Sequence, residues 1–170
     1  MKKTIIILYL ALVSWDVTAQ HDHSAHGRQT SMKQMEPMFK DKAVGTTYNQ
    51  YILLKNALVA SDFQKANLAS ESLLKAIQNA KLHDKVMSEA LLVTQAKTLA
   101  IQRNAFSSLS KEMAILVKDT GLTMGELYLE YCPMANGKTG GYWLSNDKEI
   151  SNPYFGDKML KCGRVKEVIK

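Results

Sequence analysis

The chain has few of the residues that would interrupt helices or supply catalytic groups. Its 170 residues include two cysteines, three prolines and four histidines, and no proline lies between Pro37 and Pro133. A stretch without proline favours long, uninterrupted helices. No Gly-x-Ser-x-Gly sequence, paired acidic motif or phosphate-binding loop is present, and a cysteine nucleophile would find only His83 as a base within the folded domain. The sequence therefore does not predict an enzyme.

Long hydrophobic runs are also lacking, except for a short one at the N-terminus. Lys2 and Lys3 precede the apolar residues 5–13, and the Val-Thr-Ala of residues 17–19 fits a signal-peptidase site. The run is too short to span a bilayer and stay there. We expect residues 1–19 to be a signal peptide that is cleaved between Ala19 and Gln20. A periplasmic or secreted protein without a transmembrane segment in the mature chain would result.

Charge of one sign is not concentrated anywhere in the chain. Loss of Lys2, Lys3 and Asp16 with the leader changes the net charge from +6 to +5. Basic residues are spread among acidic ones, without a basic cluster interleaved with aromatics, so nucleic acid is not an expected partner. About 150 residues is enough for one domain with its own core.

Residues 20–40 are polar and are predicted to form a flexible arm. It holds three histidines and three methionines, namely His21, His23, His26, Met32, Met35 and Met38. Imidazole and thioether groups both bind soft metal ions, and a thioether needs no deprotonation. We expect the histidines to contact metal weakly. The alternative is a solvated tail in which the last two methionines help to start the first helix.

Residues 41–120 have the apolar spacing of amphipathic helices. The residues expected to face inward are Tyr51, Leu54, Leu58, Phe63, Ala66, Leu73, Ile77, Val86, Ala90, Val93, Phe106, Leu109, Met113 and Leu116. The Ser-Asp-Phe-Gln of residues 61–64 has a capping-box pattern, His83 begins a third helix, and Gly121 can end the fourth as a left-handed cap. The predicted fold is mainly α: an up-down four-helix bundle within a domain of residues 41–170.

Residues 122–170 differ in character and predict a cap of loops and short strands on the bundle. Residues 127–131 alternate like a strand, and a glycine-rich loop follows. Aromatic residues come next, namely Tyr142, Trp143, Tyr154 and Phe155. They are expected either to shield a site from water or simply to fill the core.

Both cysteines lie in this cap, and each has a methionine within three residues. The four sulfur residues are Cys132, Met134, Met159 and Cys162. Thiolates with thioethers suit Cu(I), and also Ag(I), better than hard ions. Zinc is less suited because its structural sites use four Cys or His ligands. Within the folded domain, His83 is a further but weaker candidate ligand. The open alternative is a Cys132–Cys162 disulfide, whose 31-residue loop would stabilise the fold by roughly 3–4 kcal/mol.

The C-terminal motifs resemble a known bacterial family. They are residues 131–136 (Tyr-Cys-Pro-Met-Ala-Asn), 141–145 and 150–163, joined upstream by residues 58–62, Ile101, Arg103, Phe106, Leu109 and Ser110. Over about residues 44–168 they are similar to a secreted domain of unknown function. That domain occurs alone and at the C-terminal end of periplasmic adaptor subunits of copper/silver efflux pumps. The resemblance implies an envelope protein connected with heavy-metal handling.

Two functions of different classes follow from these observations. The first is an extracytoplasmic copper-binding protein of metal homeostasis or efflux, which holds Cu(I) through the cysteines and methionines of the cap. Its partners would be the metal ion and an efflux adaptor or other envelope metal-handling protein. The second is an interaction module of an envelope or efflux complex that binds no metal and is stabilised by the disulfide.

Overall fold

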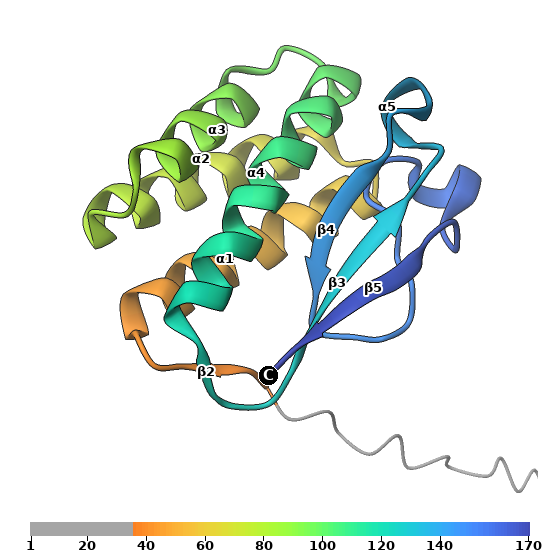
Figure 1. The fold of residues 1–170 in the computed structure, drawn as a ribbon. Coiled ribbons are helices and arrows are strands. Elements are labelled where there is room, and N and C mark those ends of the chain that lie inside the picture. The colour runs from red at the N-terminus through yellow and green to blue at the C-terminus, as the bar shows by residue number, and fades with distance from the viewer. Residues whose placement is uncertain (1–35) are drawn as a thin grey trace, which may run out of the picture. The chain divides into compact units, whose positions relative to one another are not determined.

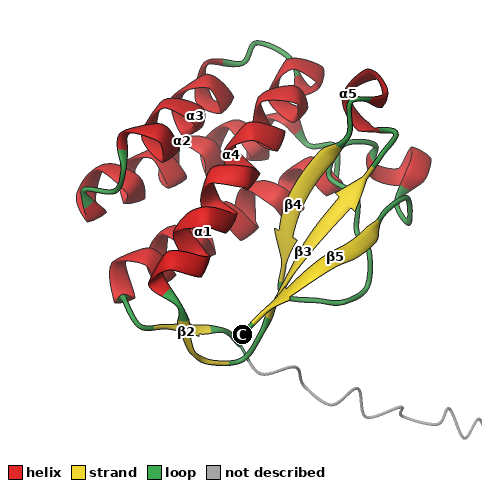
Figure 2. Cartoon of the chain, viewed as in Figure 1, coloured by secondary structure: helices red, strands yellow, loops and turns green. Residues whose placement is uncertain are grey.

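The chain divides into two units, residues 1–30 and residues 31–170, and the computed structural model describes residues 36–170. The long helices are α1 Lys42–Val59, α2 Phe63–Ala80, α3 Asp84–Gln95 and α4 Leu99–Thr120. The strands are β1 Met38–Phe39, β2 Leu122–Met124, β3 Leu127–Cys132, β4 Gly141–Ser145 and β5 Arg164–Ile169. Two short helical segments complete the fold, α5 Ala135–Lys138 and the 3-10 turn Gly156–Met159. This confirms the predicted mainly α fold with a C-terminal cap of short strands (Figures 1 and 2).

Side-chain caps fix where three of the helices begin. Asp41 caps α1 by accepting a hydrogen bond from the Ala43 N–H at 2.7 Å, and Thr98 caps α4. The cap of α2 is Asp62, which accepts from the Lys65 N–H at 3.0 Å. The predicted capping box was therefore one residue too early. Ser61 has a left-handed φ of 57° instead, because the chain turns there between the two helices.

The ends of the later helices agree with the sequence in part. His83 directly precedes α3, as predicted, but its side chain makes no capping hydrogen bond. That helix ends at Gln95 because Ala96 is extended, with ψ 132°. Gly121 ends α4 with a φ of 77°, where its N–H bonds the Val117 carbonyl at 2.9 Å. None of the helices within residues 36–170 is both long and apolar enough to cross a membrane.

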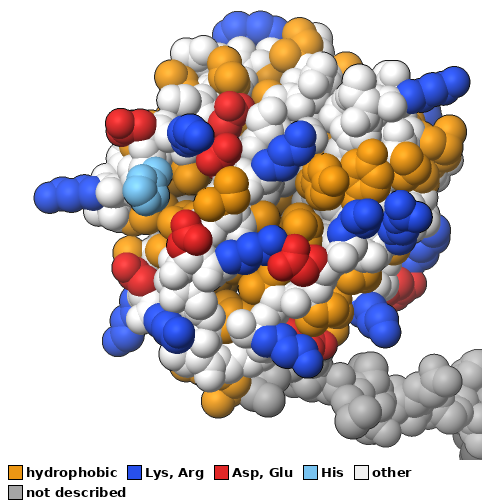
Figure 3. Space-filling model, viewed as in Figure 1, with side chains coloured by type: hydrophobic (Ala, Val, Ile, Leu, Met, Phe, Trp, Pro, Cys, Tyr) orange, Lys and Arg blue, Asp and Glu red, His pale blue; other side chains and the backbone are white. Residues whose placement is uncertain are grey.

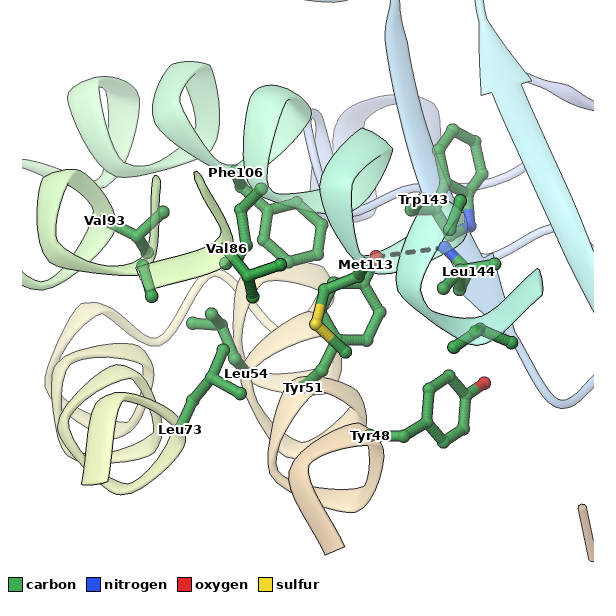
Figure 4. Close-up of a cluster of buried hydrophobic side chains, with 14 of the residues drawn as sticks. Tyr48, Tyr51, Leu54, Leu73, Val86, Val93, Phe106, Met113, Trp143 and Leu144 are labelled. Carbon is green, nitrogen blue, oxygen red and sulfur yellow. Dashed lines mark hydrogen bonds between the residues drawn. The ribbon is translucent and has the colours of Figure 1, made fainter. Parts of the chain in front are cut away.

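The helices pack in chain order around one core. α1 contacts α2, α2 contacts α3, α3 contacts α4, and α4 returns to α1. Of the residues predicted to face inward, all but Phe63 are buried, and Phe63 is half-buried at the first turn of α2. Leu54, Leu73, Val86 and Val93 meet between the helices (Figure 4). The helical part of the core was therefore predictable from periodicity.

A three-stranded antiparallel sheet, in the order β4-β3-β5, packs against α4 and α1 through β4. Tyr51 of α1 makes this contact specific. The Leu144 N–H of β4 donates to the Tyr51 hydroxyl at 3.0 Å (Figure 4). That hydroxyl also lies 2.8 Å from the Ser110 Oγ of α4. Its ring also stacks on Phe106, with centroids 5.2 Å apart. One side chain thus joins two helices to the sheet.

The long loop between β4 and β5 is held on the bundle by Arg103 of α4. Its Nε donates to the Pro153 carbonyl at 2.7 Å, and its NH2 donates to the Leu58 carbonyl at 2.7 Å and to the Ser61 Oγ at 2.9 Å. Gly156 lies beside this cluster, where an added Cβ would stand 2.3 Å from the Ser61 Oγ. The guanidinium therefore connects α4, the α1–α2 turn and the loop.

We expect Arg103→Lys to destabilise the protein by about 1–3 kcal/mol, because one ammonium cannot serve three acceptors held in this fork geometry. Urea denaturation of the two proteins measures the difference. Arg164→Lys, on the exposed start of β5, is the matched control and should change the free energy of unfolding by less than about 0.5 kcal/mol. Equal values for the two variants would show that Arg103 does not hold the loop.

Candidate functional site

The two cysteines, 30 positions apart in sequence, come together at one end of the sheet. Their Sγ atoms lie 2.7 Å apart, and the two residues are free cysteines. Cys132 is the last residue of β3 and is fully buried, opposite Gly141 of β4. Cys162 is half-buried and follows the 3-10 turn. The fold therefore unites the two thiols that the sequence singled out.

Cys162 is positioned by its backbone. Its carbonyl accepts from the Asn152 Nδ2 at 2.6 Å, and its N–H donates to the Met159 carbonyl at 3.0 Å. Gly163 follows with a φ of 149°, and a Cβ there would stand 2.8 Å from the Trp143 ring. These contacts direct the chain back into β5 and bring the Cys162 thiol to Cys132.

The distance between the two sulfur atoms fits neither a disulfide nor a shared metal ion without movement of the atoms. It is longer than the about 2.05 Å of a disulfide bond but shorter than two sulfurs around one metal require. With metal–sulfur bonds of about 2.3 Å, the sulfur atoms stand roughly 3.8 Å apart in a tetrahedral site and 4.6 Å in a linear one. The hydrogen bond to Cys132, followed by burial, raises the pKa of the Cys162 thiol to about 11. A metal ion shared by the two sulfurs would therefore require the pair to lose protons and to open by about 1–2 Å.

The methionines near the cysteines lie outside the core. Met134 immediately precedes α5 and is 47% exposed, and Met159 ends the 3-10 turn half-buried. Neither thioether is committed to packing as the buried Met113 is.

Two of the four aromatic residues of the cap, Trp143 and Tyr154, belong to the core around the site, while Phe155 packs half-buried against it and Tyr142 is half-buried but not part of it. Trp143 is fully buried, and Tyr154 packs on its edge with ring centroids 5.9 Å apart. Burial raises the pKa of the Tyr154 hydroxyl, and its ring lies close to Gly141, the residue opposite Cys132, where an added Cβ would stand 2.5 Å from the ring. The Tyr154 hydroxyl donates to the Tyr142 carbonyl. These rings shield the Cys132 side of the pair from water.

The predicted histidine ligands do not join this site in the described residues. His83 is exposed at the start of α3, in a groove of about 380 Å³ lined by Asp84, Glu112 and Asp119 among others. Figure 3 shows histidine, in pale blue, at the surface of the molecule. Within residues 36–170 no three His, Cys, Asp or Glu side chains are grouped to hold a metal. His21, His23 and His26 lie outside the described residues.

A buried carboxylate, Glu130, is a feature that periodicity did not reveal. It lies two residues before Cys132 on β3 and is fully buried, and neither of its oxygens has a partner at hydrogen-bonding distance in the described chain. Burial raises its pKa to about 8, while the buried ammonium of Lys55 and the Trp143 indole oppose the rise. The only feature of the sequence that bears on Glu130 is the strand-like alternation of residues 127–131. It could not show that Glu130 faces inward.

Residues 47–125 match the family described as "Protein of unknown function (DUF3347)". The match begins within α1 and ends just before β3, so it covers most of the helical bundle and excludes both cysteines. No curated protein and no solved structure matches the chain. The helical part is thus similar to a domain of unknown function, and the chemistry of the cap rests on its own residues.

The stability of the protein should fall as the pH rises from about 4.5 to about 8. Between the ordinary pKa of 4.5 and the folded pKa of about 8, folded Glu130 keeps a proton that the unfolded chain releases. The folded state therefore binds more protons, and unfolding becomes easier by up to roughly 1 kcal/mol per pH unit. Glu130→Gln should flatten this slope in urea titrations at several pH values. Glu71→Gln, on the exposed face of α2, should leave it unchanged, and an equal slope in all three proteins would contradict the assignment.

Proposed function

We propose that this protein binds a soft monovalent metal ion, Cu(I) or Ag(I), outside the cytoplasm and acts in metal homeostasis or efflux. The observation that carries the proposal is the 2.7 Å approach of the only two cysteines. Two thiols meet at one end of the sheet, and a methionine lies within three residues of each in the sequence. This donor set matches the preference of Cu(I) for soft ligands.

The two thiols lie in different kinds of backbone, one in a strand and one in a loop. Cys132 is fixed within the paired strand β3, whereas Cys162 lies in the connection between the 3-10 turn and β5. A shift of the Cys162 side alone can therefore widen the pair. Metal binding must displace both thiol protons, so affinity is expected to rise with pH. The exposed Met134 and the half-buried Cys162 mark the side from which an ion or a partner's ligand would approach.

A second candidate function is favoured by the same distance. An oxidising compartment would convert a pair this close into a disulfide with little movement. The protein would then be an interaction module of an envelope or efflux complex, with the cap stabilised by the crosslink. The two candidate functions are compatible, because oxidation of the thiolates to a disulfide would release a bound ion.

We expect the reduced protein to take up one Cu(I) tightly in an oxygen-free titration against a competing chelator. Cys132→Ser and Cys162→Ser should each abolish this uptake, because either change removes half of a two-thiolate site. Met134→Leu and Met159→Leu conserve side-chain volume and should weaken binding by roughly tenfold or less. Met87→Leu, on α3 away from the cap, is the matched control.

If the protein is instead an interaction module that binds no metal, the same samples should give the opposite pattern. Reduced wild type would then lose every Cu(I) to the chelator, and both methionine changes near the cysteines would be silent. Each cysteine change would lower the melting temperature only under oxidising conditions. A thiol count of the protein as isolated shows which redox form the cell contains.

The arm is expected to add weaker sites. Deleting residues 20–35 removes His21, His23 and His26 and should lower the number of copper ions bound at saturation, while the melting temperature stays nearly unchanged. Residues 36–40 are kept because β1 lies within them and Phe39 packs on Tyr48, with ring centroids 5.1 Å apart. Unchanged stoichiometry would limit the arm to a tether.

A further inference from the structure

The structure brings two methionines together at a second place, on the ribbon formed by β1 and β2. These strands pair antiparallel, with Met38 opposite Met124 and Phe39 opposite Leu122. The shift of register between the two pairs makes Thr123 the extra residue of a bulge. Met38 and Met124 are 86 positions apart in the sequence, and the pairing of β1 with β2 makes them neighbours.

The two faces of this ribbon differ. Phe39 and Leu122 are partly buried against the core. The methionine pair lies on the other face, where Met38 is 54% and Met124 46% exposed. Directly opposed residues on one face of an antiparallel pair have Cβ atoms about 4.5–5.5 Å apart. Two flexible thioethers at that separation can reach the same ion.

Several contacts hold the ribbon in place before any ligand binds. The Lys40 N–H donates to the Gly121 carbonyl at 3.1 Å, and the Thr123 hydroxyl donates to the Met38 carbonyl at 3.3 Å. Phe39 anchors β1 on the aromatic core through Tyr48. The backbone positions of the pair are thus fixed, and binding costs only the side-chain freedom of two methionines.

We propose that Met38 and Met124 form a second site for a soft monovalent cation, held by thioethers alone. Neutral sulfur donors of this kind select Cu(I) or Ag(I) over hard divalent ions. A thioether binds without losing a proton, so this site also works at low pH. It contains no thiol and keeps its ligands when Cys132 and Cys162 are joined as a disulfide. The proposal therefore does not rest on the cysteine site.

The test uses Ag(I) and the mature protein with its two thiols oxidised, so that the cysteine pair cannot compete. Methionine methyl groups labelled with carbon-13 report each thioether separately by NMR. We expect the methyl signals of Met38 and Met124 to shift together along one saturating curve. Met124→Leu should weaken the Ag(I) response of Met38 by about tenfold or more, and Met38→Leu should do the same to Met124, because each change removes one arm of a two-donor chelate.

Met87→Leu is the matched control and should leave both curves unchanged. The methyl spectrum of each variant also shows whether the fold is intact. We expect it to be, because the side chains of Met38 and Met124 are exposed. Independent curves for the two methyls, or a Met38 response that survives Met124→Leu, would overturn the two-thioether site. Absence of an Ag(I) response at both methyls in the oxidised protein, with binding that appears only after reduction, would overturn it as well, because the ion would then belong to the cysteine pair.

Discussion

The hydroxyl of Tyr51 is the contact on which the arrangement of the site depends. It accepts from the Leu144 N–H of β4 and shares a second hydrogen bond with the Ser110 Oγ of α4. Burial raises its pKa, which keeps the phenol protonated and able to make both bonds. β4 is thereby fixed on α1 and α4, and β3 pairs with β4. The position of Cys132 at the end of β3 follows from this docking.

The other half of the site is placed by a different set of polar contacts. Arg103 holds the loop after β4 on the bundle, and Asn152 holds the backbone of Cys162. One thiol thus belongs to a strand within the core and the other to a loop tied down by hydrogen bonds. In the proposed function, this arrangement would let the sulfur separation adjust to a metal ion or to a disulfide while the bundle stays in place.

The buried Glu130 has an energetic cost that the core must offset. Desolvation of a carboxylate without hydrogen-bond partners favours its protonated form, and the charge of Lys55 opposes that effect only in part. Glu130 lies on β3 near Trp143 of β4, and its charge partner Lys55 lies on α1. The raised pKa of this buried carboxyl makes the docking of the sheet sensitive to pH.

The sequence alone determined the helical part of this protein. Apolar residues at a spacing of three and four, such as Leu54 and Leu58, must face one side of a helix, and most of the predicted core is buried for that local reason. It also marked Cys132 and Cys162 by composition. Only the tertiary structure decided that their sulfurs meet, that Glu130 faces inward and that Met38 opposes Met124. Strand register and sheet docking join residues far apart in the chain, and no local pattern encodes which of them become neighbours.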